Sequence, residues 1–230
     1  MSDHSFFLLQ VNDALFPIGG YSHSQGLETY IQNGLVHDEA SASEYILHKL
    51  KWALAYTELL AVRLAYEKAF AADLDGLLLL EQTLEASRIP CEQRDAVRKM
   101  GSRFAKTIEN LKLPISESGI FRDYLDARGT KMVSHCCIYG VFCAAMEIPL
   151  SDALSHFLYA QASAMVTNCV KTIPLSQSSG QKILSGCYGC FQEILSQVRD
   201  LTEEDLCLSA PGFDLRGIQH ERLYSRIYMS

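Results

Sequence analysis

Apolar residues recur along most of the chain with the three- to four-residue spacing of helices that bury one face. The clearest case lies between Asp38 and Phe70, a segment that contains no proline or glycine. Its apolar residues recur at steps of three, four and seven: Ile46, Leu50, Ala53, Leu60 and Leu64. Ser41 and Glu44 have the spacing of a capping box, so the pattern predicts one long helix that is capped by Ser41.

Helical periodicity also covers further segments, most of which end near a proline or a glycine. They are residues 6–14, 73–87, 92–111, 116–127, 151–171 and 176–198. Residues 132–146, MVSHCCIYGVFCAAM, are almost free of charge, and a helix that is apolar on all sides is buried or lies in an interface. No segment alternates in the manner of a strand between two turn signals. The pattern therefore predicts an all-α, bundle-like domain of about eight to ten helices, with the uncharged helices near its centre.

The end of the chain has a different character, and we divide the sequence into a domain, residues 1–205, and a carboxy-terminal tail, residues 206–230. The tail ends in a stretch rich in arginine and aromatic residues. If this stretch is helical, Leu223 and Ile227 lie on one face of the helix, and Tyr224 and Tyr228 lie together on another. Chain ends usually fray. We therefore expect the tail either to fold back onto its own domain or to dock onto a partner, with tyrosine and arginine as anchors.

Composition limits the classes of function. The 230 residues are 48% hydrophobic and 20% charged, with a formal net charge of −7, as is ordinary for a globular protein. The acidic balance argues against nucleic-acid binding, which needs a basic footprint. No apolar stretch approaches the length of about 20 residues that crosses a membrane. Because no signal peptide is recognisable, we expect a cytoplasmic protein whose eight cysteines are reduced thiols.

The segment FPIGGYSHSQGLE, residues 16–28, is rich in residue types that catalytic loops use. It does not fit a phosphate-binding loop, because leucine and glutamate stand where that motif needs lysine and serine or threonine. It does not fit a nucleophile elbow, because the second glycine is missing. We predict instead a turn after which Ser22, with Gln25, caps a new helix. The polar groups left over for surface contacts or buried hydrogen bonds belong to Tyr21, His23 and Glu28.

Two cysteine-rich segments keep an alternative open. Cys187 and Cys190 have C-x-x-C spacing, and His135 is followed by Cys136 and Cys137. A structural zinc site usually joins two paired clusters, and a thioredoxin-like motif needs a βαβ unit. Packing of small buried thiols is therefore the simpler interpretation. The alternative is an all-helical metal-dependent or thiol enzyme that uses His135 and the cysteine cluster.

A third marked segment is PLSQSSGQ, residues 174–181. Either Ser176 or Ser178 caps the helix that follows, and Ser178 with Gln181 fits a capping box. Gly180 costs about 1 kcal/mol relative to alanine inside a helix. We therefore expect another segment of the chain to approach closely at Gly180.

Four motifs in register over residues 8–230 resemble those of the urease accessory protein F family. They are PIGGYSHSQGLE (17–28), HCCIYGV (135–141), KTIPLSQSSGQ (171–181) and HERLYSRIY (220–228). The chain departs from the family pattern at Cys136, where the family has proline, at Lys171, where arginine is usual, and at Ser176, where it has glycine. Lysine keeps the charge of arginine but not its bidentate fork.

The resemblance implies an all-α, dimeric protein without enzymatic activity. It implies that the chain binds accessory protein H, also called D, against which the tail becomes ordered. It further implies that this complex recruits the nickel-carrying GTPase, protein G, and docks on apo-urease. We predict no catalytic residue, no metal site and no cofactor. The residues expected to bind partners are Tyr21, Ser22, His23, Glu28, Lys171, Gln177, Gln181, Leu223, Tyr224, Arg226 and Tyr228. For Tyr21, His23 and Glu28 the resemblance implies that they hold a surface either against a partner or against the chain's own tail.

Overall fold

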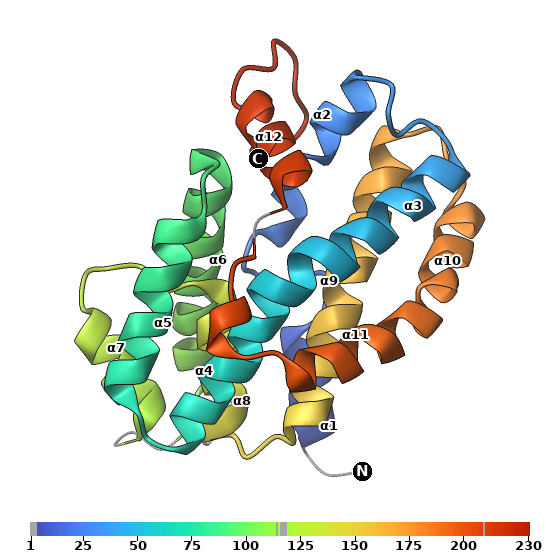
Figure 1. The fold of residues 1–230 in the computed structure, drawn as a ribbon. Helices are drawn as coiled ribbons and strands as arrows, with labels where there is room; N and C mark the ends of the chain where they lie inside the picture. The colour runs from blue at the N-terminus through green and yellow to red at the C-terminus, as the bar shows by residue number, and fades with distance from the viewer. Residues whose placement is uncertain (1–3, 114, 116–118, 209) are drawn as a thin grey trace.

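The computed structural model describes residues 4–113, 115, 119–208 and 210–230, and they form a packing of helices (Figure 1). Over these ranges there is no β-strand, which confirms the predicted all-α fold. The first half contains α1 (His4–Val11), η1 (Gly20–Ser22), α2 (Leu27–Gln32), α3 (Glu39–Lys49), η2 (Leu50–Leu59), α4 (Leu60–Phe70), α5 (Leu74–Ser87) and α6 (Cys91–Leu111). The second half contains α7 (Ile120–Arg128), α8 (His135–Ala145), α9 (Leu150–Thr172), α10 (Gln177–Gly186), α11 (Tyr188–Asp200), η3 (Glu203–Asp205) and α12 (Pro211–His220).

The elements α3, η2 and α4 follow one another without a break and form the long helix that the periodicity predicts. Its middle part, η2, is a π-helix of ten residues. The predicted cap at Ser41 is wrong, because Asp38 is the N-cap and its Oδ1 accepts from the Ser41 amide at 2.8 Å. The Asp38 amide donates in turn to Ser41 Oγ at 3.1 Å. A carboxylate at the positive end of a helix interacts more strongly than a hydroxyl, so the helix starts at the aspartate.

Helix α8 lies in the core, and its residues from His135 to Ala144 are all buried. The central position predicted for the uncharged segment is therefore confirmed. Gly140 allows α8 to pack tightly against α4, because a Cβ at this position would lie 2.5 Å from the carbonyl oxygen of Val62. The ring of Phe104, from α6, packs against α8 at 5.6 Å from the ring of Phe142.

Three predicted helices differ in extent from the observed ones. α1 begins and ends earlier than the predicted residues 6–14. The predicted helix 176–198 is two helices, α10 and α11, which meet at Cys187. Gly186 and Gly189 flank this junction and weaken helical propensity there. The predicted start of helix 116–127 lies outside the described residues, and α7 begins at Ile120.

The long helix separates two groups of helices. In Figure 1, α5, α6 and α7 lie on one side of it, and α9, α10 and α11 lie on the other. α12 lies at one end of the molecule beside α2. Among the described helices, none is both long enough and apolar enough to cross a bilayer. The position of α12 brings the end of the chain back to the loop that precedes α2.

Candidate functional site

The loop that leads into α2 is shaped by glycines and not by a serine cap. Gly19 and Gly26 adopt positive φ angles of 80° and 87°. The predicted cap at Ser22 with Gln25 is wrong, because Ser22 Oγ donates to the Gly19 carbonyl at 2.7 Å and α2 begins only after Gly26. The reason is the close approach of α12: a Cβ on Gly26 would lie 3.2 Å from the Gly217 amide nitrogen.

The Glu28 side chain binds backbone amides of the tail. Glu28 is only 4% exposed. Oε1 accepts from the Ile227 amide at 2.7 Å, and Oε2 accepts from the Tyr228 amide at 3.1 Å. Oε2 also lies 3.3 Å from Nε2 of His220. A carboxylate can be buried at a tolerable cost only when such charge-assisted hydrogen bonds replace its water, and here the tail provides all three.

His220 and Glu92 continue this arrangement. Nδ1 of His220 lies 2.8 Å from Oε2 of Glu92, and Arg226 donates to the other oxygen of Glu92. Burial alone would raise the pKa of Glu92, but the hydrogen bonds from His220 and Arg226 outweigh it and hold that pKa below its ordinary value. Both ring nitrogens of His220 thus face carboxylates, one on α2 and one on α6, and the end of α12 is fixed between them.

The last residues of the chain pair with the loop itself. The Met229 amide donates to the Ser22 carbonyl at 2.9 Å, and the Ser24 and Gln25 amides donate to the Ser230 main-chain oxygen at 2.6 and 2.9 Å. The Ser24 hydroxyl donates to the same oxygen at 2.9 Å. Together these groups form what we call the tail clasp: Ser22 to Gln25, Glu28 and Glu92 on the domain, and His220 with Arg226 to Ser230 on the tail.

The structure therefore places the tail on its own domain, which is the first of the two alternatives for this segment. The stretch after His220 is not helical, because α12 ends at that residue, so the face-sharing that a helix would have produced does not arise. The backbone amides of Ile227, Tyr228 and Met229 would bond to carbonyls of the same helix if this stretch were helical. They donate instead to the Glu28 carboxylate and the Ser22 carbonyl. Tyr228 is 5% exposed, whereas Tyr224 is fully exposed, so these two tyrosines do not share a face.

The predicted partner-binding residues fall into two groups. Ser22, His23, Glu28, Arg226 and Tyr228 meet in or beside the clasp, where His23 Nδ1 lies 2.9 Å from Ser230 Oγ. Burial, together with the nearby cations Lys99 and Arg103, lowers the pKa of His23. Tyr21 and Tyr224 project from the clasp into solvent, with Tyr21 70% exposed, and Leu223 is half-buried.

Lys171, Gln177 and Gln181 form the second group, at the junction of α9 and α10. All three are exposed, and no hydrogen bond among the described residues joins their side chains to the clasp. Ser176 caps α10 by accepting from the Ser179 amide at 3.0 Å, so the alternative cap at Ser178 with Gln181 is wrong. The close approach expected at Gly180 is confirmed, because a Cβ there would lie 2.7 Å from Cγ2 of Val170.

Several residues of the site were not singled out from the sequence. Ser24, Glu92 and His220 form clasp hydrogen bonds, and the side-chain amide of Asn168 on α9 donates to the His23 carbonyl at 3.0 Å. No local pattern marks Asn168, because α9 also carries other polar residues such as Gln161 and Thr167. Glu92 gave no signal either, because an acidic residue in the first turn of a helix is ordinary.

The residues of the enzymatic alternative are buried in the core. His135 packs between the rings of Phe104 and Phe157 at 5.6 and 5.7 Å, and burial lowers its pKa to about 4. Burial raises the pKa of Cys187 to about 11 and raises that of Cys137 well above its ordinary range. A cysteine reacts or binds metal as a thiolate, so these residues do not support a thiol enzyme. Within the described ranges, no group of three or more side chains could hold a metal ion.

Comparison with known proteins gives a consistent result. A protein-family model described as UreF matches residues 36–188. Three relatives carry the name urease accessory protein UreF. The one from Lachnoclostridium phytofermentans is 31% identical over 230 residues, which is the whole of both chains. The one from Bacillus sp. (strain TB-90) is 34% identical over 225 residues, 97% of each chain. The one from Arthrobacter sp. (strain FB24) is 32% identical over 223 residues, 97% of this chain and 96% of the relative. The alignment with the relative from Lachnoclostridium phytofermentans extends beyond the family model, over both halves of the tail clasp.

Proposed function

This chain belongs to the UreF family of urease accessory proteins, and on that premise we propose that it serves urease maturation as a non-catalytic scaffold. In this proposal it binds accessory protein H/D, and the complex recruits the nickel-carrying GTPase G to apo-urease for nickel insertion. It acts in the cytoplasm as a homodimer. Residues 206–230 are its docking segment, presented by the clasp.

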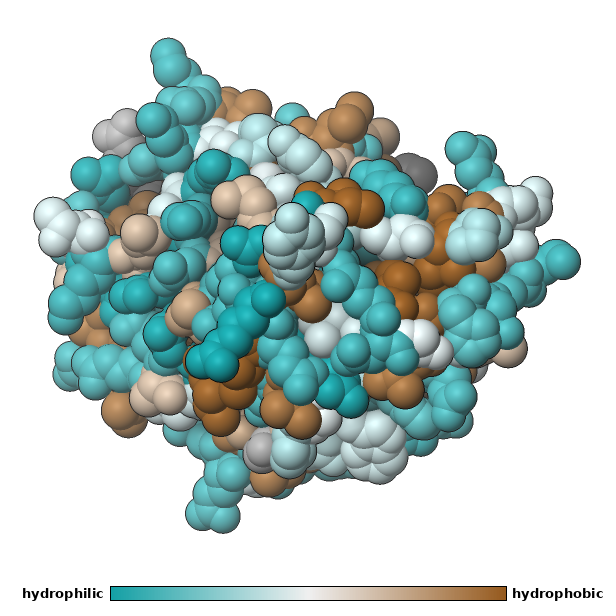
Figure 2. All heavy atoms as spheres, turned by 90° about the horizontal axis from the view of Figure 1, so that it is seen from above, coloured by the Kyte–Doolittle hydropathy of each residue, from teal (hydrophilic) through white to brown (hydrophobic). Residues whose placement is uncertain are grey.

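The observation that carries this proposal is the contrast between the two sides of the clasped tail. The backbone of the tail is bound to the domain, whereas the side chains of Tyr224, Ile227 and Met229 are largely exposed. The face that carries α12 has hydrophobic side chains set among hydrophilic ones (Figure 2). Exposed aromatic and aliphatic residues held on a rigid backbone lose little conformational entropy on binding, which favours their use as anchors for a partner.

The tail can be tested separately from the clasp. Tyr224→Ala and Ile227→Ala remove exposed side chains but leave the backbone hydrogen bonds to Glu28 in place. Loss of an anchor residue costs at least about 2 kcal/mol of binding free energy. We therefore expect the dissociation constant for protein H/D to rise tenfold or more, and co-purification to fall accordingly. Leu79→Ala is the matched control, because Leu79 is an exposed leucine on α5, outside the clasp.

Deleting residues 223–230 should abolish co-purification with protein H/D while the far-ultraviolet circular dichroism of a helical protein is retained. Urease activation is then measured after mixing each variant with the accessory proteins, nickel, GTP and apo-urease. We expect activation to follow complex formation across the series. Unchanged complex formation by the deletion variant would contradict the role given to the tail.

A further inference from the structure

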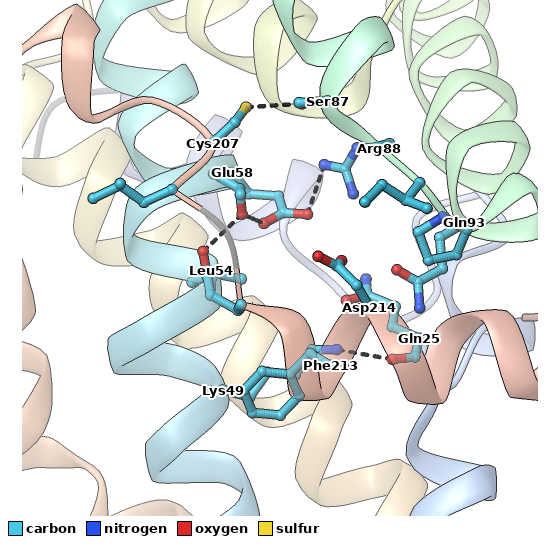
Figure 3. A pocket seen from close by; sticks show the side chains of 16 residues that line it. Gln25, Lys49, Leu54, Glu58, Ser87, Arg88, Gln93, Cys207, Phe213 and Asp214 are labelled. Atoms are coloured by element: carbon cyan, nitrogen blue, oxygen red, sulfur yellow. Dashed lines mark hydrogen bonds and ion pairs between the residues drawn. The ribbon is translucent and has the colours of Figure 1, made fainter.

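A small cavity with charged walls lies next to the clasp, between η2, the connection from α5 to α6, and the first turn of α12 (Figure 3). Its volume is about 120 Å³, which equals the volume of roughly four water molecules. Two cations and two anions line it: Lys49, Arg88, Glu58 and Asp214. Asp214 lies in the proposed docking segment, but the function proposed above gives none of these four side chains a role.

The four charges are not all paired with one another. Arg88 Nη2 and Glu58 Oε1 form an ion pair at 2.7 Å. Lys49 Nζ donates to the Gln25 carbonyl at 2.8 Å and lies 5.0 Å from the centre of the Phe213 ring. Among the described residues, no ion pair or hydrogen bond reaches the Asp214 carboxylate, which projects into the cavity in Figure 3. The cavity therefore carries one cation and one anion without a charged partner.

Two further observations indicate that the cavity lacks a hydrogen-bonding partner. Within the described ranges, the buried donors Arg88 Nε and Gln93 Nε2 have no acceptor. Lys49 is buried and Asp214 is half-buried, and burial lowers the pKa of Lys49 to about 8 and raises that of Asp214, so each charge has lost part of its water. A buried donor or charge without a partner is unfavourable, and a ligand with complementary groups relieves this cost.

The backbone of one wall is also unusual. η2 contributes Ala53, Leu54, Thr57 and Glu58 to the cavity, and it is a π-helix over ten residues. π-Helical segments are usually single-turn bulges, and they are frequent at functional sites. The π-helical stretch thus coincides with the part of the long helix that faces the cavity.

We propose that this cavity binds a small α-amino acid of the size of glycine or alanine. The ligand carboxylate accepts hydrogen bonds from Lys49 Nζ and Arg88 Nε, and its ammonium group donates to Asp214. A simple anion would be repelled by Asp214, and a simple cation by Lys49, so a zwitterion is the class that both charges favour. The volume admits about five or six non-hydrogen atoms and excludes larger side chains.

The test is a titration of the full-length chain with glycine and with L-alanine, in which binding is measured by isothermal titration calorimetry and by ligand-observed NMR. We expect saturable binding with a dissociation constant on the order of 1 mM, as befits a ligand of so few atoms. Asp214→Asn and Lys49→Met should each weaken binding about tenfold, because each removes a charged hydrogen-bonding partner. Asp200→Asn, at an exposed position on α11, should bind glycine like the unaltered chain.

A second arm uses only the unaltered protein and so does not depend on the folding of any variant. L-Leucine is too large and should not compete with glycine, whereas L-alanine should. Acetate and methylammonium, each with only one of the two charges, should bind at least tenfold more weakly than glycine. The proposal is overturned if glycine does not bind saturably. It is also overturned if either single ion binds as well as glycine, or if Asp214→Asn binds glycine unchanged.

Discussion

At the scale of single residues, the burial of polar groups separates the clasp from the core. Glu28 and His220 are buried with partners on all sides, so they act as structural connectors between segments 192 positions apart. His135 is buried among aromatic rings, and its Nε2 has no hydrogen-bond partner among the described residues. The two histidines are therefore expected to respond differently to substitution.

Replacing Glu28 by alanine should release the tail. It removes the acceptor of the Ile227 and Tyr228 amides and leaves His220 beside an empty space, so we expect a loss of about 2–4 kcal/mol in the free energy of unfolding. Urea denaturation measures this loss, and hydrogen exchange should show faster exchange at these two amides. Glu109→Ala, at a surface ion pair with Arg122, should have a small effect. Unchanged exchange at Ile227 and Tyr228 would rule out Glu28 as their anchor.

Neutral His135 should make the fold sensitive to acid. Its pKa in the folded protein is about 4, below the ordinary 6.5, so the unfolded chain takes up the proton first as the pH falls. The stability that the neutral ring contributes is complete above pH 6.5 and is lost progressively down to about pH 4, by about 1.4 kcal/mol per pH unit. His135→Leu should remove this component of the slope of unfolding free energy against pH. Equal slopes for the variant and the unaltered chain would contradict it.

At the scale of elements, the sequence predicts a helix well where one face is apolar and misses features that depend on distant segments. The long helix and the buried α8 follow from local periodicity, which needs no knowledge of the tertiary structure. The glycine turn before α2 does not, because Gly26 is required by α12, almost 200 residues later. The irregular tail after His220 was missed for the same reason, since its backbone partners lie on α2 and in the preceding loop.

The contact between α4 and α8 should tolerate no added side-chain atom. In Gly140→Ala the new methyl group would lie 2.5 Å from the Val62 carbonyl oxygen, so the helices must separate, and we expect a loss of about 1–3 kcal/mol in unfolding free energy. Gly186→Ala, at the end of α10, meets nothing within 4 Å and should be neutral or stabilising by up to about 1 kcal/mol. Thermal unfolding measures the stability of both variants. Equal stability of Gly140→Ala and Gly186→Ala would contradict this prediction.

At the scale of the whole molecule, the sequence indicated the helical class and singled out residues 17–28 and 220–228, but it left open whether Tyr21, His23 and Glu28 hold a partner or the chain's own tail. In the structure, His23 and Glu28 contact the tail. Each of the two segments carries polar residues that no local pattern satisfies, and only the folded chain supplies their partners. The sequence also left open whether the tail folds back or docks outward. In the structure the backbone does the first, and we propose that the exposed side chains do the second.

The proposed homodimer needs an apolar face outside the core. α8 is too deeply buried to supply it, whereas Phe6 and Leu9 on α1 and Tyr159 on the adjoining α9 are 61%, 58% and 46% exposed. We expect Leu9→Glu to shift the protein to monomer in size-exclusion chromatography with light scattering, because a charge in an apolar interface is costly. Leu79→Glu, on α5, should leave the dimer intact. A dimer that persists in Leu9→Glu would place the interface elsewhere.

The clasp also has a consequence for the order of events during synthesis. Ser24 and Ser230 are separated by 206 positions, so the donors of the loop find their acceptor only after residue 230 has been synthesised. Helices can form and pack as they are made, but the clasped surface cannot exist on an incomplete polypeptide. A chain that stops before residue 226 would therefore lack the tail side of the clasp, and on the function proposed above its partners would discriminate against it.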